Sequence, residues 1–593
     1  MRSLHVWAGV PILALVIGLG GWVVLTPNWA IAVVEAQALR NLGRALTVDG
    51  GAHLEIVPEL ALRLDQVSLA GPPGADDPFI SAAALRLPLR FSNLFTHQLE
   101  LRHITLVDPE INLSVDEMGR GSWPDQAGAE PAAADFFLEN ATVRVADKRN
   151  GQSFAFDKAG LAASISEAGE LTIGGTAVIN DGLARLQAYV KNVARVSAGG
   201  SPAELTLTAP ALSVDFSGRL VTAGAIGLAG TITVSGPDLR AGLAWTGSAP
   251  GGQRGLKAFS LSGGLDATGR AFAVHGAEVS LDGIAGKGDL SLDFRGTVPK
   301  LVARLDTAAI RLDTYLPETI WQGGDWGIAP LGLAGLRGLD ATVKLSLPDL
   351  VAGRLHTGPA SIDATLIGGR LDASFASASL PAAKLTLDGS GEVQGFALAL
   401  HSLDPTGLIG PLANIAWLTC AGTLDLSVQA TGASQQEMVS TLKGEARLDL
   451  ATGAIHGIDV GKALAAVSRE MQDGWPGGGS GETAFTSLAA QFSIADGIAS
   501  TKDMKLDNPS LTMSGTGDID LLRQALDLRA DPRLITGKRG ETAGLPVAVV
   551  VKGPWLAPRL YPDMADIVAN PKAAYEALKG LGVTQSPGAT GGN

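Results

Sequence analysis

The segment from Gly422 to Ala430, GTLDLSVQA, alternates apolar and polar side chains without interruption. Its apolar residues, Leu424, Leu426 and Val428, fall on one side of an extended chain, and the residues between them are polar. Successive side chains of a β-strand point to opposite faces, so this two-residue period predicts a strand with one apolar and one polar face. The stretch therefore favours a sheet protein over a helical one.

The same alternation recurs over most of the chain from about residue 46 onward, with turn markers such as Asp282-Gly283, Gly369 and Gly389 between the alternating segments. No regular helical segments intervene to build parallel βαβ units, so hairpins and meanders are expected. We therefore predict a mostly β protein with a few helices, in which an elongated, curled antiparallel β-sheet forms an apolar groove. Two further alternating stretches are Leu212, Val214 and Phe216, and Leu290, Leu292 and Phe294.

Length and composition set the outer limits of the interpretation. A chain of 593 residues exceeds what one compact core usually organises. Its 76 glycines, 5% aromatic residues and 18% charged residues suit turn-rich β structure, since charged residues average about 25% in soluble proteins. The formal net charge of −14 repels phosphate backbones, so nucleic acid is not an expected partner. The single cysteine, Cys420, cannot form an internal disulfide.

The chain begins with an apolar run, Val6 to Leu25, that contains no ionisable side chain. About 20 residues at 1.5 Å each span a hydrocarbon core of roughly 30 Å, so a single transmembrane helix is predicted over residues 6–25. Arg2 and His5 precede the run, and the positive-inside rule then places the N-terminus in the cytoplasm and the rest of the chain outside. The alternative is a cleaved signal peptide. Thr26 to Trp29 makes a poor cleavage site, so an anchor is preferred.

Helices are predicted in only a few places. After the apolar run, Asn28 is a candidate N-cap for a helix with apolar residues at helical spacing, and Gly43 is a candidate stop. Trp321 and Trp326 dip into a membrane, cover a groove opening or pack locally in a loop, and loop packing is the preferred interpretation. The other predicted helices are Gly407–Leu418, Val460–Met471 and Pro571–Leu581.

The apolar face of the predicted sheet has two possible uses. Alternation alone does not distinguish a closed, dry core from an open groove that accepts acyl chains, and on pattern alone the closed core is favoured. The low aromatic content slightly favours the groove, because Leu, Val and Ala leave room for flexible alkyl chains. The candidate lining residues of such a groove are Leu212, Val214, Phe216, Leu290, Leu292, Phe294, Leu424, Leu426 and Val428.

Several segments near both ends of the chain resemble the AsmA family in order and spacing. The N-terminal ones are GRALTVDG at Gly43–Gly50 and the segments Leu60–Leu87 and Leu99–Trp123, which follow the apolar run and the short helix. The C-terminal ones are Gly422–Leu464, Gly515–Arg529 and Leu545–Asp563. Residues from about 130 to 400 match the family only in general β character.

The resemblance implies a protein anchored in the bacterial inner membrane, with a periplasmic body similar to bridge-like lipid-transfer proteins. It also implies phospholipid as a partner, with outer-membrane or periplasmic proteins as further candidates, and a role in phospholipid traffic or outer-membrane homeostasis. It suggests no catalytic residues and no cofactor. The expected segments are a cytoplasmic tail (1–5), a transmembrane helix (6–25), an AsmA-like N-terminal region (26–130), a repetitive β body (131–400), an AsmA-like C-terminal region with helices (401–565), and a short helix with a disordered tail (566–593).

Two other functions compete with lipid transport. An enzyme is not expected, because common hydrolase, ATPase and metal-binding motifs are missing from the sequence. The best acid candidates for a glycosidase are Asp76-Asp77 and the pair Asp518 and Asp520. The remaining alternative is a scaffold or assembly factor for outer-membrane proteins, which would use exposed strand edges and no lipid conduit.

Overall fold

The computed structural model describes most of the chain from residue 27 to residue 572. The predicted transmembrane helix at 6–25 and the C-terminal tail from 573 onward lie outside the described part. None of the helices in the described ranges has the length and apolar content needed to cross a membrane. Between 27 and 572 the residues that are not described are 58, 73–76, 91–98, 100–101, 116–121, 123–132, 148–151, 180–181, 197, 222–226, 246–253, 316–324, 414, 458–474, 477–480, 510, 537–540, 545–547 and 570.

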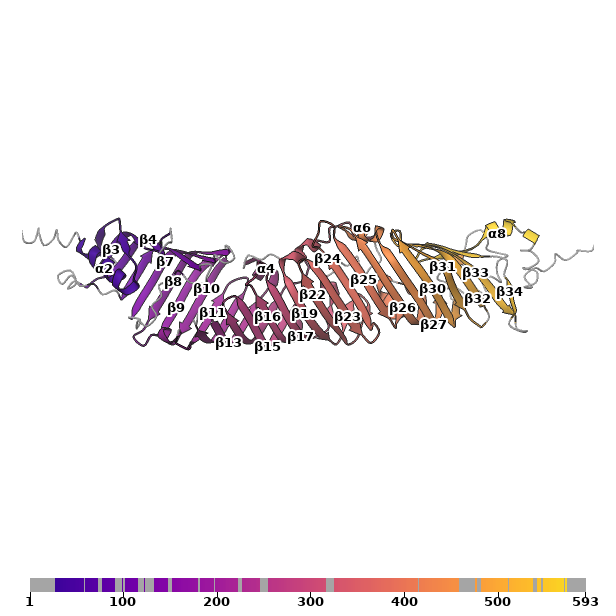
Figure 1. Cartoon of the computed structure of the whole chain (residues 1–593), viewed down its shortest axis with the longest axis horizontal. Coiled ribbons are helices and arrows are strands. Elements are labelled where there is room, and N and C mark those ends of the chain that lie inside the picture. The colour runs from indigo at the N-terminus through magenta and orange to yellow at the C-terminus, as the bar shows by residue number, and fades with distance from the viewer. Residues whose placement is uncertain are drawn as a thin grey trace, which may run out of the picture. The chain divides into compact units, whose positions relative to one another are not determined.

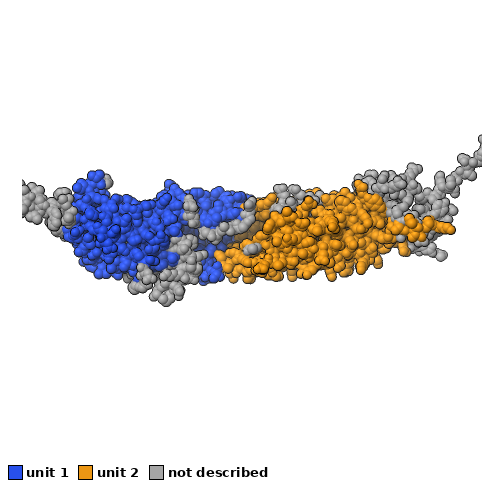
Figure 2. Space-filling view, turned by 90° about the horizontal axis from the view of Figure 1, so that it is seen from above, with its two compact units in different colours: residues 1–250, 256–283, 287–297 blue, residues 251–255, 284–286, 298–593 orange. Residues whose placement is uncertain are grey.

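The chain divides into two compact units (Figure 2). The first comprises residues 1–250, 256–283 and 287–297, and the second comprises 251–255, 284–286 and 298–593. Within each unit the strands lie side by side in an order that largely follows the chain (Figure 1). The predicted fold class is confirmed in its coarse form, since the protein is mostly β with few helices.

Among its described residues the first unit contains three helical segments and a long run of strands. The helical segments are α2 (Trp29–Leu42), the 3-10 helix η1 (Val193–Arg195) and α4 (Leu239–Trp245). The strands are β1 (Leu46–Val48), β2 (Ala52–Glu55), β3 (Ala61–Leu69), β4 (Ile80–Pro88), β5 (His103–Val107), β6 (Glu110–Val115), β7 (Ala134–Asp147), β8 (Gln152–Ile165), β9 (Leu171–Ile179), β10 (Gly182–Val190), β11 (Ser201–Thr208), β12 (Ser213–Val221), β13 (Gly227–Gly236), β14 (Phe259–Thr268), β15 (Ala271–Leu281) and β16 (Ile284–Asp293), whose residues 284–286 group with the second unit.

Helix α2 forms where the helical spacing predicts it and lies against the first strands. Its apolar side chains Ala30, Val34 and Ala38 are buried. Strands β1 and β2 both pair with β3, and β3 pairs with β4, all antiparallel. Helix and strands together enclose a hydrophobic core in which Leu62 and Leu64 are fully buried. This N-terminal part of the sheet is therefore covered on its apolar face.

The two ends of α2 differ in how well the sequence predicts them. Gly43 ends the helix in the left-handed conformation, with φ 67°, and its N–H donates to the Leu39 carbonyl. Glycine adopts this conformation at little cost, so the predicted stop is confirmed. The predicted N-cap is wrong: Asn28 has helical angles and its side chain makes no capping hydrogen bond. The Ala30 N–H donates instead to the Pro27 carbonyl, which already starts the turn.

The rest of the first unit is a meander with one irregular step. From β7 to β15 each strand pairs antiparallel with the next. Strand β5 pairs with the first part of β7, and β6 pairs with the last part, with the same difference in residue number between partners. Both strands run parallel to β7. A parallel pair requires a long return connection, which residues 116–133 supply. The expectation of a purely antiparallel sheet is therefore wrong at this step.

The second unit repeats this architecture with more strands. Its helical segments are η2 (Leu312–Thr314), η4 (Leu333–Gly338), α5 (Pro405–Ala413), α6 (Gln435–Ser440) and α8 (Met564–Ala569). Its strands are β17 (Lys300–Thr307), β18 (Ile310–Arg311), β19 (Asp340–Leu347), β20 (Leu350–Ala352), β21 (Leu355–His356), β22 (Ala360–Ile367), β23 (Arg370–Ser377), β24 (Ala382–Asp388), β25 (Gly395–Ser402), β26 (Leu418–Thr431), β27 (Lys443–His456), β28 (Trp475–Pro476), β29 (Glu482–Phe485), β30 (Ser487–Ala495), β31 (Ile498–Asp507), β32 (Leu511–Asp520), β33 (Ala525–Thr536), β34 (Glu541–Gly544), β35 (Val549–Pro554) and β36 (Arg559–Pro562).

Strand pairing in the second unit departs from the antiparallel expectation at two pairs, β17 with β19 and β18 with β20. Strand β17 runs parallel to β19, because the chain returns through β18, η2 and η4 before the next strand begins. From β19 the sheet continues antiparallel through β22 to β27, and then through β30 to β33, β35 and β36. Strands β18, β20 and β21 form a small separate sheet.

The last strands of the second unit are curled. In a flat sheet the six steps from β26 to β35, at about 4.8 Å each, would separate these strands by about 29 Å. The Trp417 indole N–H, at the start of β26, nevertheless donates to the Trp555 carbonyl, at the end of β35, at 2.9 Å. This part of the sheet therefore bends round far enough to bring the two strand ends together.

The remaining helix predictions have mixed outcomes. A helix was expected over Gly407–Leu418, and α5 spans Pro405–Ala413 instead, because the alternating residues from Leu418 onward join β26 and pair with β27. Helices α4 and α6 were not predicted, since each is only one or two turns long. The predicted helix at Val460–Met471 lies outside the described residues.

Candidate functional site

One face of the sheet in the first unit carries apolar side chains in continuous cross-strand rows. Directly paired residues share a face, so the register of the strands defines each row. Many of these residues belong to a single hydrophobic cluster. We call this surface, and its counterpart in the second unit, the apolar face. One of its rows runs across β10 to β15 through Leu186, Leu207, Val214, Val234, Leu261 and Val279.

The apolar face of the second unit is built in the same way. Its rows cross the parallel pair β17 and β19 and continue through the antiparallel strands, because every strand keeps the two-residue alternation in register. One such row runs through Leu305, Leu345, Ile362, Phe375, Ala383, Leu400, Leu426, Ala446 and Phe492.

The opposite face is polar and carries cross-strand pairs of charged and hydroxyl side chains. Lys287 donates to Glu278 at 2.6 Å, which lowers the pKa of the Glu278 carboxyl and raises the pKa of the Lys287 ammonium. Lys344 lies 2.7 Å from Asp363, and Ser500 donates to Asp518 at 2.5 Å. Exposed pairs of this kind contribute little stability each, so this polar face mainly keeps that side of the sheet soluble.

The nine predicted lining residues all follow the apolar alternation of their strands. Two lie just outside them: Leu212 precedes β12, and Phe294 follows β16, where its ring packs edge-on against Phe272 with centroids 6.0 Å apart. Leu212 also lines a depression of about 370 Å³ beside Phe259 at the strand ends. The buried members are Leu212, Phe216, Leu424 and Val428, and the partly exposed members are Val214, Leu290, Leu292, Phe294 and Leu426. Their role as a lipid lining stays a prediction.

Exposure of the apolar face varies along the chain. Next to α2 the leucines are sealed, with Leu62 and Leu64 at 0% and Leu87 at 1% exposed. Across β17 to β25 several larger residues at equivalent positions are only half-buried, including Leu345, Leu385 and Leu398, whereas Ala303, Ala341, Leu347 and Ala383 are buried. The prediction from the sequence named no residue in this stretch, although the alternation there is equally clear.

Glycines on the apolar face were a second feature that sequence reasoning missed. Gly218 of β12 and Gly230 of β13 are paired directly opposite each other. A Cβ on Gly218 would lie 2.3 Å from the Ala229 carbonyl oxygen, and one on Gly230 would lie 2.3 Å from that of Ser217. The two strands therefore approach too closely here for any side chain. An isolated glycine within an alternating strand is the sequence signal for such an approach.

The acidic candidates for catalysis that the structure describes make local hydrogen bonds. Asp518 accepts a hydrogen bond from Ser500, and Asp520 accepts from the backbone N–H and the guanidinium of Arg523 at the following turn. Asp77 is exposed, and Asp76 lies outside the described residues. In the described part of the chain no group of three or more His, Cys, Asp or Glu residues could hold a metal ion.

The tryptophan loop packs against the protein. The Trp326 indole N–H donates to the Leu521 carbonyl at 2.9 Å, and the neighbouring Gly327 N–H donates to the side chain of Gln435 at 3.0 Å. The preferred interpretation, loop packing, is confirmed for Trp326. Trp321 lies outside the described residues.

The fold and the two faces together define a class of protein, namely one with a long amphipathic β-sheet that has one apolar and one polar face. The AsmA family model matches residues 5–177 and 405–504, which include α2 with the first strands and the segment from α5 to β31. Over these two segments the chain matches the AsmA family, as the sequence resemblance predicted. Residues 178–404 lie outside the match. Neither the curated proteins nor the solved structures gave a match to this chain.

Proposed function

We propose that this protein takes part in phospholipid transport between the inner and outer membranes, and thereby in outer-membrane homeostasis, by sheltering acyl chains on its apolar face. The match to the AsmA family is consistent with an envelope role related to lipid transport. The observation that carries the proposal is the half-buried state of Leu345, Leu385 and Leu398 on the apolar face of β19 to β25.

The exposed apolar area of this face and the length of its strands both suit an acyl chain. Apolar surface left in water costs about 25 cal/mol per Å², so a sheet face with several partly exposed apolar side chains favours an apolar partner. Strand β22 has eight residues, which at about 3.3 Å each extend for about 26 Å. One leaflet of a bilayer is about 15 Å thick, half of the roughly 30 Å hydrocarbon core. The apolar face is therefore wide enough to hold an acyl chain.

In this proposal residues 6–25 anchor the chain in the inner membrane and the sheet lies in the periplasm. The apolar run without charges and the preceding Arg2 and His5 support this topology. Phospholipid is the expected partner, and outer-membrane or periplasmic proteins are further candidates. We propose no catalytic activity and no cofactor. We also propose no nucleic-acid partner, because the acidic net charge of −14 disfavours polyanions.

The test is lipid analysis by mass spectrometry of the purified full chain, with one substitution on each face of β26. Leu426→Lys places a charge on the apolar face, where an ammonium among acyl chains costs several kcal/mol. Ser427→Lys places the same charge on the polar face, where Glu445 is the directly paired residue on β27. We expect Leu426→Lys to lose most of the co-purified phospholipid and Ser427→Lys to retain it.

A milder variant, Leu426→Gln, guards against loss of folding, and its circular dichroism should match that of the parent protein. Equal phospholipid content in all variants would contradict the proposal. A lipid-free chain that still restores envelope integrity in cells would support a scaffold for outer-membrane proteins instead.

A further inference from the structure

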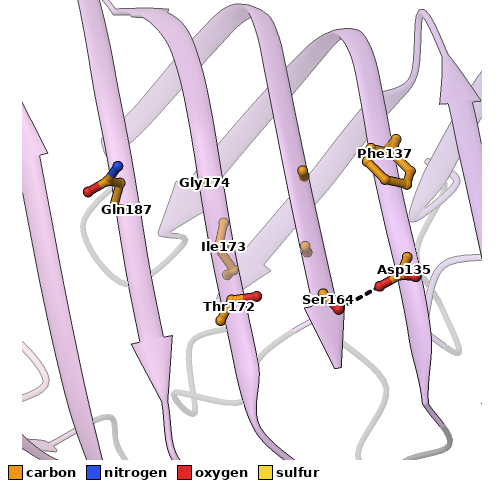
Figure 3. Close-up of a pocket in the computed structure, with 9 residues that line it drawn as sticks. Asp135, Phe137, Ser164, Thr172, Ile173, Gly174 and Gln187 are labelled. Carbon is orange, nitrogen blue, oxygen red and sulfur yellow. Dashed lines mark hydrogen bonds between the residues drawn. The ribbon is translucent and has the colours of Figure 1, made fainter. Parts of the chain in front are cut away.

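The polar face of the first unit carries a shallow trough across β7, β8, β9 and β10 (Figure 3). Its volume is about 350 Å³, near the lower end of the roughly 300–1,000 Å³ found for small-molecule sites. It lies on the face opposite to the apolar one and is separate from the proposed lipid site. Its main lining residues are Asp135, Phe137, Ser164, Thr172, Gly174 and Gln187.

The strand register explains why there is a depression at this place. Phe137 pairs with Ala162, Ala162 pairs with Gly174, and Gly174 pairs with Gln187, so these four positions form one row across the strands. The two central positions carry a methyl group and a hydrogen, and the two outer positions carry large side chains. The result is a low floor between an aromatic wall and an amide wall, and Figure 3 shows Phe137 and Gln187 at its opposite sides.

The adjacent row supplies oriented polar groups. Ser164 Oγ donates to Asp135 Oδ1 at 2.5 Å, and His103 Nδ1 lies 2.8 Å from Asp135 Oδ2. These contacts hold the carboxylate in place and leave it further acceptor capacity. Thr172 pairs with Ser164 in the register and adds a hydroxyl, and Gln187 can both donate and accept. The trough therefore combines fixed hydrogen-bonding groups with an aromatic ring that is 44% exposed.

This combination discriminates between ligand classes. The residues that line the trough include a carboxylate and no lysine or arginine, which disfavours nucleotides, phosphates and other anions. Burying an acyl chain against Asp135 would desolvate a charge, which also disfavours lipid tails. A saccharide presents hydroxyls at its edge and C–H groups on its face, which match the polar groups and the Phe137 ring respectively. We infer that the trough binds a neutral saccharide of one or two rings.

Gly174 provides the decisive substitution. A Cβ at this position meets nothing within 4 Å, so Gly174→Val would fill the trough without a clash and with a residue that favours strands. Gly264→Val is the matched control: it lies on the polar face of β14, where a Cβ would be 3.6 Å from the His275 carbonyl oxygen, an ordinary contact. A third variant, Phe137→Ala, removes only the aromatic wall.

The experiment titrates three neutral trisaccharides, maltotriose, cellotriose and N,N′,N″-triacetylchitotriose, each of which can place one or two of its rings in the trough. The full chain is held in a detergent without a sugar headgroup, and binding is followed by saturation-transfer difference NMR. We expect at least one trisaccharide to bind with a Kd of roughly 1 mM, as suits an open site with few contacts. Gly174→Val should weaken binding at least about tenfold, Phe137→Ala about three- to tenfold, and Gly264→Val not at all.

Three results would overturn the inference: no trisaccharide binds the parent protein, binding is unchanged in Gly174→Val, or a nucleotide or peptide competes fully for the trough. The lipid content of Gly174→Val should equal that of the parent protein. The saccharide site and the proposed lipid site can therefore fail independently.

Discussion

The N-terminal strands β1 to β4 and the middle strands β19 to β25 follow the same rule and have different outcomes. Both alternate apolar and polar residues, and both place their leucines on a single face. Beside α2, Leu62 and Leu64 have no exposed surface, whereas Leu385 and Leu398 remain half-buried. Alternation therefore decides which face of a strand is apolar, but a separate element decides whether that face is closed.

The largest expected effect separates these two regions by stability. Leu64→Ala removes a fully buried side chain and should destabilise the N-terminal core by about 2–5 kcal/mol. Leu385→Ala removes a half-buried side chain and should cost clearly less, because water already reaches part of it. Native-state hydrogen exchange of the β3 and β24 amides measures the two local stabilities within one molecule.

Equal losses of local stability at the two positions would show that the middle strands are as tightly covered as the N-terminal ones. This result would contradict the difference between the two regions. Ser374→Ala, on the polar face of β23, is the control and should change the exchange of neither strand by more than about 0.5 kcal/mol.

A smaller effect is expected from the end of the covering helix. Gly43→Ala forces a Cβ into a left-handed residue, with φ 67°, and should destabilise the attachment of α2 by about 1 kcal/mol. The cost comes from the backbone alone, because an added Cβ meets nothing within 4 Å. The hydrogen-exchange rate of the β3 amides should rise, and that of the amides in β19 to β25 should stay unchanged. Unchanged β3 exchange would mean that α2 is not needed to cover these strands.

The sequence predicted the parts of this fold that depend on local chemistry. The two-residue period identified the faces of β12, β16 and β26, and Gly43 identified the end of α2. Parallel pairing was missed because it depends on where a connection returns the chain, which residues 116–133 and 308–339 do not reveal by their own pattern. The closed and the open parts of the apolar face could not be told apart, since covering by α2 is a tertiary contact.

The sequence predicts that the candidate site is an apolar sheet face. It predicts only some of the residues that are exposed on that face. The nine named residues do follow the apolar alternation, but the half-buried residues of β17 to β25 were not singled out. Exposure depends on what packs above a residue, and Leu385 and Leu64 have similar sequence neighbours. The trough on the polar face depends on Ala162 and Gly174 meeting across two strands, a register that one strand's sequence does not contain.

The smallest expected effect concerns pH and lies beside the open strands, in the loop between β19 and β22. His356 Nδ1 lies 2.7 Å from Asp349, and this hydrogen bond, aided by the Thr357 and Gly358 N–H groups, lowers the pKa of the Asp349 carboxyl. A lowered folded-state pKa stabilises the loop above the ordinary aspartate value near 3.9, and this stabilisation is lost as the pH falls through the depressed value. The leucines of the N-terminal core are held by burial, to which this titration does not contribute.

Asp349→Asn isolates this contribution, because the amide oxygen can still accept from Gly358 while the charge is gone. Exchange of the Thr357 and Gly358 amides, corrected for its intrinsic pH dependence, should be faster in the variant at pH 6. The parent protein should approach the variant as the pH falls below about 3.9. A constant difference across this range would mean that the loop is held by geometry and not by charge. The difference between the two regions would then rest on burial alone.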